Sequence, residues 1–155
     1  MGRRSALTMS TDFRDGKTFP RRGREALGGF LWLARVFDKA RAKTNRTHDG
    51  YIYPCPMDRA VMHRWGISTS EFTTAISERP TDDQIVAWLS EHATPDRMRA
   101  ANEWLLRQEF ALYRQDAEEG VAGAVGPKLP REVILGIAVA ALVLLASLLV
   151  RVLHP

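Results

Sequence analysis

Apolar side chains recur every three or four positions over residues 24–43, which is the spacing of an α-helix. Trp32 and Val36 fall on the opposite side of the same predicted helix. Because a helix that is apolar on two sides is buried on both, we expect this helix at the centre of a bundle. The pattern therefore predicts an all-α fold built around residues 24–43.

Four more helices are predicted by residues that favour helix starts and stops. Proline is common at the first helical position and glycine just after the last, and a Ser or Thr three residues before Glu or Gln forms a capping box. The signals are Pro56 and Gly66, Ser68 with Glu71 for a helix to about Glu78, Thr81 with Gln84, and Thr94 with Pro95 for a helix to about Glu118. We expect a small helical bundle of about five helices.

The C-terminal part of the chain has a different composition. Residues 120–130 hold three glycines and two prolines, which indicates a flexible linker. Residues 133–150 then run for 18 positions without a charge. At about 1.5 Å per residue, such a helix is roughly 27 Å long, close to the roughly 30 Å hydrocarbon core of a bilayer. The sequence therefore predicts a single C-terminal transmembrane helix, with residues 131–155 as a tail anchor.

Several side chains in and around this apolar run are candidates for specific contacts. Basic residues that flank a span are expected at the membrane interfaces, and small residues on one helical face allow another helix to approach closely. The interface candidates are Lys128, Arg131 and Arg151, and the packing candidates are Gly136, Ala140 and Ser147. The alternative for the packing candidates is that small residues are common in any span.

Charge is unevenly distributed along the chain. The net charge is +4, and residues 1–26 carry seven basic and three acidic side chains. We expect a basic N-terminal arm over 1–26, in front of a near-neutral helical domain over 27–119. Solvated disorder is the default interpretation of such an arm. The alternatives are contact with an anionic lipid surface or with an acidic partner subunit, made by the basic residues Arg21, Arg22 and Arg24.

The N-terminal segment also bears on location. No apolar stretch follows Arg3 and Arg4, so no export signal is predicted. We therefore expect a single-pass protein of the inner (cytoplasmic) membrane, with its N-terminal domain in the cytoplasm. The larger number of basic residues before the span than after it agrees with this orientation.

Candidate chemistry is sparse. Cys55, the single cysteine, lies between Pro54 and Pro56, which restrict the local backbone and could present the thiol to a substrate or to haem. The alternative is a small buried apolar side chain. A thiol nucleophile would need a nearby histidine, and His48 and His63 are the local candidates. Because no paired metal-ligand spacing, phosphate loop or nucleophile elbow is present, we predict no cofactor, metal site or catalytic residue.

A second apolar patch is expected near the end of the last predicted helix. Leu106, Phe110 and Tyr113 are spaced four and three residues apart. Either the linker or the basic arm covers this patch, or the patch is a protein contact surface.

Several segments in order resemble a known bacterial family. They are residues 18–22 (TFPRR), 27–35 (LGGFLWLAR), 38–43 (DKARAK), 51–58 (YIYPCPMD) and 81–88 (TDDQIVAW). Over residues 12–110 the chain resembles the family catalogued as domain of unknown function 5069. The resemblance implies a small helical cytoplasmic domain and supplies no catalytic residues, and the linker and span are additions to the usual family pattern.

A helical domain with a tail anchor resembles, in architecture alone, the accessory subunits of bacterial energy-transducing membrane assemblies, photosynthetic reaction-centre and antenna complexes among them. We therefore predict a non-catalytic accessory or scaffolding subunit of a larger membrane protein complex. The alternative is a membrane-tethered enzyme or a haem or thiol sensor centred on Cys55. Nucleic acid is not an expected partner, because the arm has one aromatic side chain before Phe19 and no recognised nucleic-acid-binding fold follows it.

Overall fold

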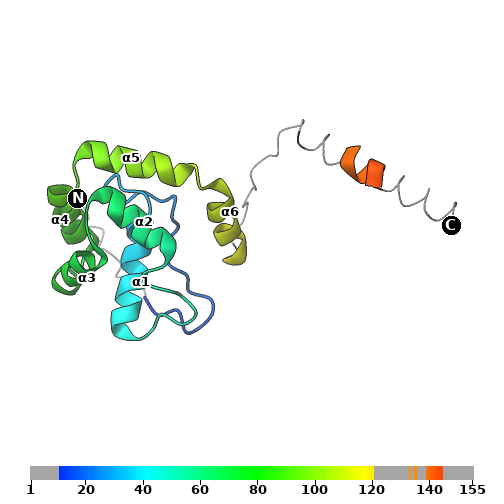
Figure 1. Cartoon of the computed structure of the whole chain (residues 1–155). Helices are drawn as coiled ribbons and strands as arrows, with labels where there is room; N and C mark the ends of the chain where they lie inside the picture. Colours follow the sequence, from blue (N-terminus) through cyan, green and yellow to red (C-terminus); the bar gives the residue numbers. More distant parts are fainter. Residues whose placement is uncertain (1–10, 121–132, 134, 136–138, 145–155) are drawn as a thin grey trace, which may run out of the picture. The chain divides into compact units, whose positions relative to one another are not determined.

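The computed structural model describes residues 11–120, 133, 135 and 139–144, and its secondary structure in these ranges is helical (Figure 1). The predicted all-α class is thereby confirmed. The helices of residues 11–120 are α1 (Leu33–Asn45), α2 (Pro56–Trp65), α3 (Thr69–Glu78), α4 (Asp82–His92), α5 (Pro95–Leu106) and α6 (Glu109–Glu118). The chain divides into two compact units, Met1–Ala124 and Val125–Pro155, and these six helices belong to the first.

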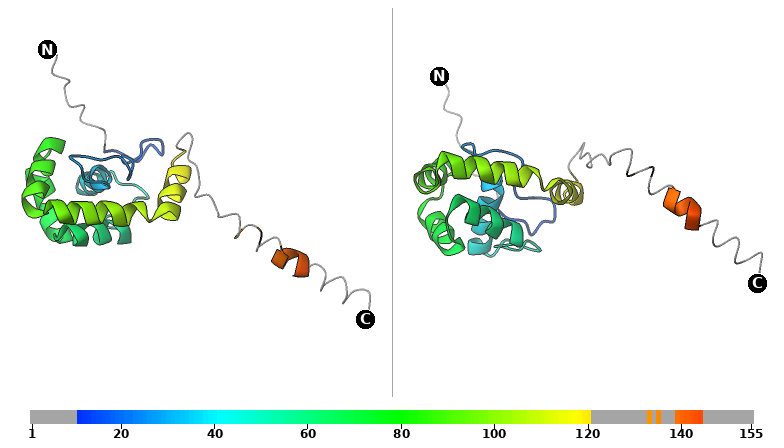
Figure 2. Two further views of the ribbon diagram at one scale, coloured as in Figure 1. Left: turned by 90° about the horizontal axis from the view of Figure 1, so that it is seen from above. Right: turned by 45° about the horizontal axis from the view of Figure 1, so that its top comes forward.

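Helix α1 is the centre of the first unit, as its two-sided apolar pattern predicts. Its side chains Leu33, Val36 and Phe37 are at most 1% exposed. They belong to one apolar cluster that includes Trp65 of α2 and Phe72 of α3. In the left view of Figure 2, α1 is seen nearly end-on with the other helices and the N-terminal segment around it. Burial on all sides explains why this helix carries apolar residues on two faces.

The predicted helix starts after residue 66 are confirmed. The side-chain oxygens of Ser68, Thr81 and Thr94 each accept a hydrogen bond from the backbone N–H three residues later. Each bond satisfies an N–H that the first turn of a helix leaves without a partner. These starts were predictable because a cap depends on residues that are close in sequence.

The first predicted helix begins nine residues later than its apolar pattern suggests, at Leu33 rather than at residue 24. Gly28 and Gly29 have positive φ angles of 58° and 86°, and Trp32 has a φ of 71°. A β-carbon on Gly28 would lie only 2.2 Å from a methyl carbon of Val86, so the backbone approaches α4 where only glycine fits. Residues 24–32 therefore form turns whose apolar side chains mimic helical spacing.

The last predicted helix is two helices, which corrects the expected continuous helix over residues 95–118. Helix α5 ends at Leu106, and α6 starts at Glu109 after the joint formed by Arg107 and Gln108. Figures 1 and 2 show α6 turned away from the axis of α5. The turn brings Leu112, which is 2% exposed, into the apolar cluster. Burial of this side chain in the core accounts for the direction of α6.

The N-terminal segment from Thr11 onward packs against the helical unit. Phe13 is 2% exposed, and its ring meets that of Tyr51 edge-on, with 5.1 Å between the ring centroids. The Trp32 backbone N–H donates to the Gly23 carbonyl oxygen at 2.8 Å. Residues 11–26 thus pack against the domain that the sequence places after them.

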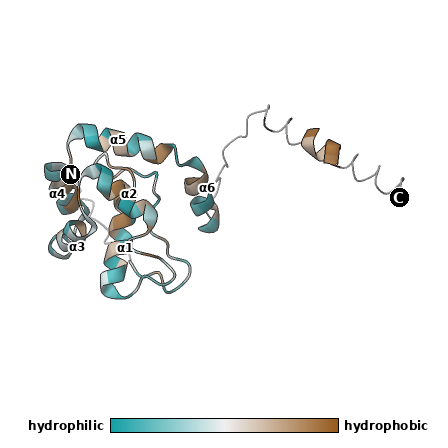
Figure 3. Ribbon diagram, in the orientation of Figure 1, coloured by the Kyte–Doolittle hydropathy of each residue, from teal (hydrophilic) through white to brown (hydrophobic). Residues whose placement is uncertain are grey.

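The second unit is described at residues 133, 135 and 139–144, which are helical and apolar (Figure 3). Over the part of the chain that the structure describes, no helix has the length and apolar character needed to cross a membrane. Ala140 lies in the described helical stretch and is exposed. The other predicted packing and interface residues lie outside the described ranges: Gly136, Ser147, Lys128, Arg131 and Arg151.

Candidate functional site

A cavity of about 510 Å³ lies between α1, the segment before α2, and α6. Its three sides come from parts of the chain that are far apart in sequence. The lining residues are Trp32, Arg35 and Lys39 on the first side, Gly50, Tyr51, Ile52, Cys55, Pro56 and Met57 on the second, and Ala111, Arg114, Gln115, Glu118 and Glu119 on the third. The cavity contains the single thiol of the chain and borders on two buried ion pairs.

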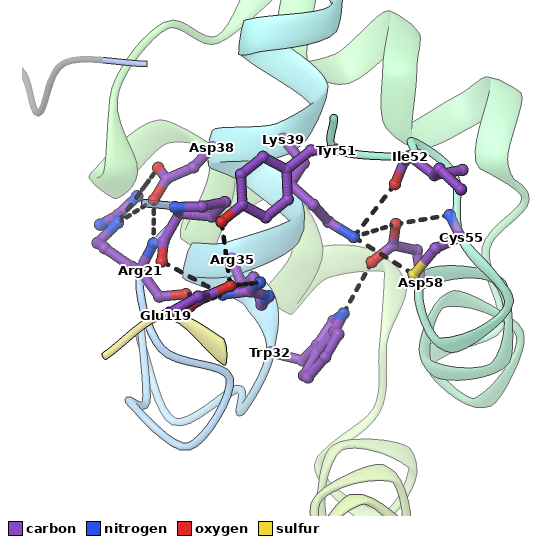
Figure 4. Close-up of polar contacts among 11 residues, drawn as sticks. Arg21, Trp32, Arg35, Asp38, Lys39, Tyr51, Ile52, Cys55, Asp58 and Glu119 are labelled. Atoms are coloured by element: carbon purple, nitrogen blue, oxygen red, sulfur yellow. Dashed lines mark hydrogen bonds and ion pairs between the residues drawn. The ribbon is translucent and has the colours of Figure 1, made fainter. Parts of the chain in front are cut away.

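The first ion pair is built on Asp58, whose side chain is wholly buried. Its two carboxylate oxygens accept hydrogen bonds from the Trp32 indole N–H at 2.9 Å, the Lys39 ammonium at 2.7 Å and the Cys55 backbone N–H at 2.8 Å (Figure 4). Asp58 lies in the first turn of α2, where the helix dipole also favours a negative charge. A buried carboxylate is tolerated here because each of its oxygens has a charged or polar donor.

The Lys39 ammonium connects Asp58 to the thiol. Its nitrogen lies 3.3 Å from the Cys55 sulfur and 3.4 Å from the Ile52 carbonyl oxygen, and its side chain is 4% exposed. A buried ammonium needs acceptors for its three protons, and these three groups supply them. The cation also lies 5.9 Å from the centre of the Trp32 ring. The residue beside the thiol is thus a lysine, and the structure gives neither His48 nor His63 a hydrogen bond to it.

The second ion pair joins α1 to the end of α6. Both terminal nitrogens of Arg35 donate to the Glu119 carboxylate, and the Tyr51 hydroxyl donates to the same carboxylate at 3.2 Å. Arg35 and Glu119 are 2% and 9% exposed. The Arg35 guanidinium carbon lies 5.7 Å from the centre of the Trp32 ring and 5.8 Å from that of Tyr51. Bidentate pairing with a carboxylate and cation–π contact with aromatic rings both stabilise a buried guanidinium.

The two tyrosines of the segment before α2 stay protonated over the whole neutral range. Burial raises the pKa of Tyr51 to about 12, and the nearby Glu119 carboxylate adds to the shift. Burial likewise raises the pKa of Tyr53 to about 12. Tyr51 therefore acts as a hydrogen-bond donor to Glu119 and contributes no charge.

Arg21, a predicted arm residue, is a buried link between helices. Its guanidinium donates to Asp38 of α1 at 2.8 Å and to Asp82 of α4 at 2.9 Å. Burial alone would lower the pKa of Arg21, but the hydrogen bonds that it donates to Asp38 and Asp82 outweigh burial and raise the pKa above its ordinary value. Only 12% of the Arg21 side chain is exposed, so Arg21 makes its contacts with residues of the first unit.

The other two arm residues are paired at the surface. Arg22 donates to Asp116 of α6 at 3.1 Å, and Arg24 lies 4.0 Å from the same carboxylate. Their side chains keep 49% and 40% of their surface exposed. Arg22 and Arg24 thus hold α6 while still reaching solvent.

The structure separates the three residues of the predicted apolar patch. Leu106 is the last residue of α5 and is 48% exposed, whereas Phe110 and Tyr113 lie on α6. Phe110 is 68% exposed and Tyr113 is half-buried. Leu106 and Phe110 therefore remain candidates for contact with another molecule.

Sequence analysis missed most of this site. Trp32, Arg35 and Lys39 follow one another at helical spacing, but they are 19 to 84 positions away from the acidic residues that pair with the two cations. One local signal was present, because Asp58 follows Cys55 by three residues at a helix start, as the acid of a capping box does. In the described ranges, no cluster of three or more His, Cys, Asp or Glu side chains could hold a metal ion.

Within residues 11–120, the fold and the site define an all-helical domain in which two buried ion pairs border one cavity. The chain belongs to the family described as a domain of unknown function (DUF5069), which it matches over residues 17–131. The resemblance predicted from the sequence is thereby confirmed at the level of the family. A search of curated proteins finds no match to this chain.

Proposed function

We propose that this chain is a non-catalytic accessory or scaffolding subunit that docks on a larger membrane protein complex. An energy-transducing assembly, such as a photosynthetic reaction-centre or antenna complex, is the first candidate for that complex. The apolar run over residues 133–150 supports a single membrane-spanning anchor, flanked by Lys128, Arg131 and Arg151 and packed through Gly136, Ala140 and Ser147. In this proposal the domain lies on the cytoplasmic side of the inner membrane, close to an anionic lipid surface.

The observation that carries the docking proposal is the exposure of Phe110. This ring is 68% exposed on α6, and Leu106 is 48% exposed at the end of α5. Burying such a side chain fully contributes about 1.5–3 kcal/mol, so two of them can anchor a contact. The proposed partner surface is an apolar patch on a membrane protein of the same complex, since α6 leads directly into the linker before the anchor.

Charge has a smaller role in this proposal than the sequence alone suggests. Arg22 and Arg24 retain exposed surface beside α6. In this proposal they face an acidic patch of the partner or an anionic lipid surface. Arg21 is held by Asp38 and Asp82, so it supports the fold of the docking domain instead.

The test is the size of the assembly that contains the full chain after mild detergent extraction of membranes. The unmodified chain is expected in an assembly much larger than a monomer or dimer, and Phe110→Ser combined with Leu106→Ser is expected to release it. Phe19→Ser, which removes an apolar side chain 41% exposed elsewhere, is the matched control. Migration of the unmodified chain as a free monomer or homodimer contradicts the proposal.

A second candidate function is favoured by the contact between Lys39 and Cys55. The ammonium at 3.3 Å from the sulfur, beside a cavity of about 510 Å³, supports a membrane-tethered enzyme or a haem or thiol sensor. A positively charged neighbour is a common feature of reactive cysteines. If the chain is a haem sensor, titration of the purified chain with haem should give an absorbance band that Cys55→Ala abolishes. If it is a thiol enzyme or sensor, a thiol reagent should label Cys55 faster in the unmodified chain than in Lys39→Met. A chain with neither property is not such a sensor.

A further inference from the structure

We propose that α6 is a hinged cover of the cavity beside Cys55, held closed by the ion pairs of Asp116 and Glu119. This proposal is independent of docking on a complex, because it concerns only contacts within residues 11–120. It assigns to α6 the control of access to the one thiol of the chain.

Helix α6 and the residue after it form one wall of the cavity. Ala111, Gln115 and Glu119 lie on this wall, and Ile52 and Cys55 lie on the wall formed by the segment before α2. The buried groups Trp32 and Lys39 lie beneath, on the side of α1. Movement of α6 therefore widens the cavity beside the thiol, and it withdraws Leu112 from the core cluster.

The attachment of α6 to the rest of the unit is small and mostly ionic. Of the residues of α6, only Leu112 and Asp116 are buried. Asp116 is held by Arg22 and Arg24, and Glu119 is held by Arg35 and Tyr51 (Figure 4). Helix α6 buries a single apolar side chain, Leu112, whereas each of α1 to α4 buries several, so separating α6 exposes less apolar surface than separating any of those helices.

The joint before α6 has the features of a hinge. Gln108 precedes α6 with φ −85° and ψ 41°, which is not helical, and no side chain caps the start of α6. The backbone N–H groups of Arg107 and Gln108 donate back to α5, to the Glu103 oxygen at 3.3 Å and the Leu105 oxygen at 2.9 Å, and the first hydrogen bond of α6 runs from the Leu112 N–H to the Gln108 oxygen at 3.0 Å. Rotation at Arg107 and Gln108 thus leaves both α5 and α6 intact as helices.

Opening about this joint has a defined consequence. It separates Glu119 from Arg35 and widens access to Cys55, which is partly exposed in the closed form, and to the Lys39 ammonium beside it. The Asp58 contacts remain, because all of them come from α1 and α2 and the residues just before these helices. The open form is therefore a folded domain whose thiol is more accessible to a bulky reagent than in the closed form, rather than an unfolded chain.

The test combines amide hydrogen exchange with labelling of Cys55 by a bulky maleimide, both on the full chain in detergent. In Glu119→Gln, exchange of the α6 amides and labelling of Cys55 should each rise at least about tenfold, since the amide oxygen is a weaker acceptor for Arg35 and Tyr51 than the charged carboxylate. Amides of α2 to α4 should keep the rates of the unmodified chain. Glu109→Gln is the matched control, because Glu109 is exposed on the same helix and has no ion pair with a described residue.

A second variant keeps the proposal testable if Glu119→Gln does not fold. Asp116→Asn removes the negative charge that pairs with Arg22 and Arg24, and it should raise the same two rates by a smaller factor. The proposal is overturned if α6 exchange rises without faster labelling of Cys55, if neither rate changes in a folded variant, or if exchange rises equally in all six helices. The last result would make Glu119 a general stabiliser of the domain.

Discussion

At the scale of single residues, Asp58 has the largest role in the buried polar cluster. It is wholly buried, and it neutralises Lys39 while accepting from the Trp32 indole and the Cys55 backbone. Loss of its charge leaves the buried Lys39 ammonium without a counter-charge and with neutral acceptors around it, among them the Cys55 sulfur and the Ile52 carbonyl. An uncompensated buried charge is among the costliest defects in a folded protein.

Asp58→Asn is therefore expected to lower the free energy of unfolding by about 3–5 kcal/mol, the range measured when one partner of a buried ion pair is removed. Urea unfolding followed by circular dichroism measures this change. Glu78→Gln is the control, because it makes the same carboxylate-to-amide change in an exposed pair with Arg79. The control should change stability by less than about 1 kcal/mol. Equal effects of the two substitutions would contradict the role of Asp58.

At the scale of helices, the starts of α3 and α4 differ in one useful way. Both are capping boxes, but the third residue after the cap is Glu71 in α3 and Gln84 in α4. The hydrogen bond from the Ser68 hydroxyl, followed by that from the Ser68 backbone N–H, lowers the pKa of Glu71 below its ordinary 4.5. Because the folded pKa lies below the unfolded one, the stabilisation by Glu71 is complete above about pH 4.5 and is lost as the pH falls.

We therefore expect the unmodified chain to lose more stability than Glu71→Gln when the pH falls from about 5 to about 3. The reciprocal variant, Gln84→Glu, should lose more than the unmodified chain over the same interval. Urea midpoints at the two pH values measure both differences, and the other carboxylates contribute equally to all three proteins. Parallel pH curves for the three proteins would show that the boxes do not contribute in this way.

The predicted helix ends are confirmed where the end depends on residues close in sequence. They are wrong where the end depends on packing between distant segments. The caps at Ser68, Thr81 and Thr94 follow from local hydrogen bonds, so their positions are confirmed. The start of α1 and the break between α5 and α6 were missed. The first depends on the fit of Gly28 against Val86, and the second on burial of Leu112, and neither contact is visible in the local pattern.

At the scale of the whole molecule, the proposed docking face and the proposed anchor belong to different units of the chain. Phe110 lies in the unit Met1–Ala124, whereas the apolar run lies in Val125–Pro155. The docking proposal therefore implies that docking on the complex and anchoring in the membrane can be lost independently of each other. The Phe110→Ser and Leu106→Ser variant should leave the large assembly and still sediment with membranes. Loss of the same variant from the membrane fraction would mean that docking, and not the apolar run, holds the chain there.

The sequence by itself determined the all-helical class, the capped helix starts and the family, because each depends on periodicity or on residues close along the chain. It also predicts the anchor, which lies largely outside the described residues. Tertiary structure alone decided that Lys39 lies beside Cys55, that Arg35 meets Glu119 from 84 positions away, and that Arg21 is buried. Such contacts depend on how helices pack around one core, and side chains that are distant in sequence meet only after that packing has formed.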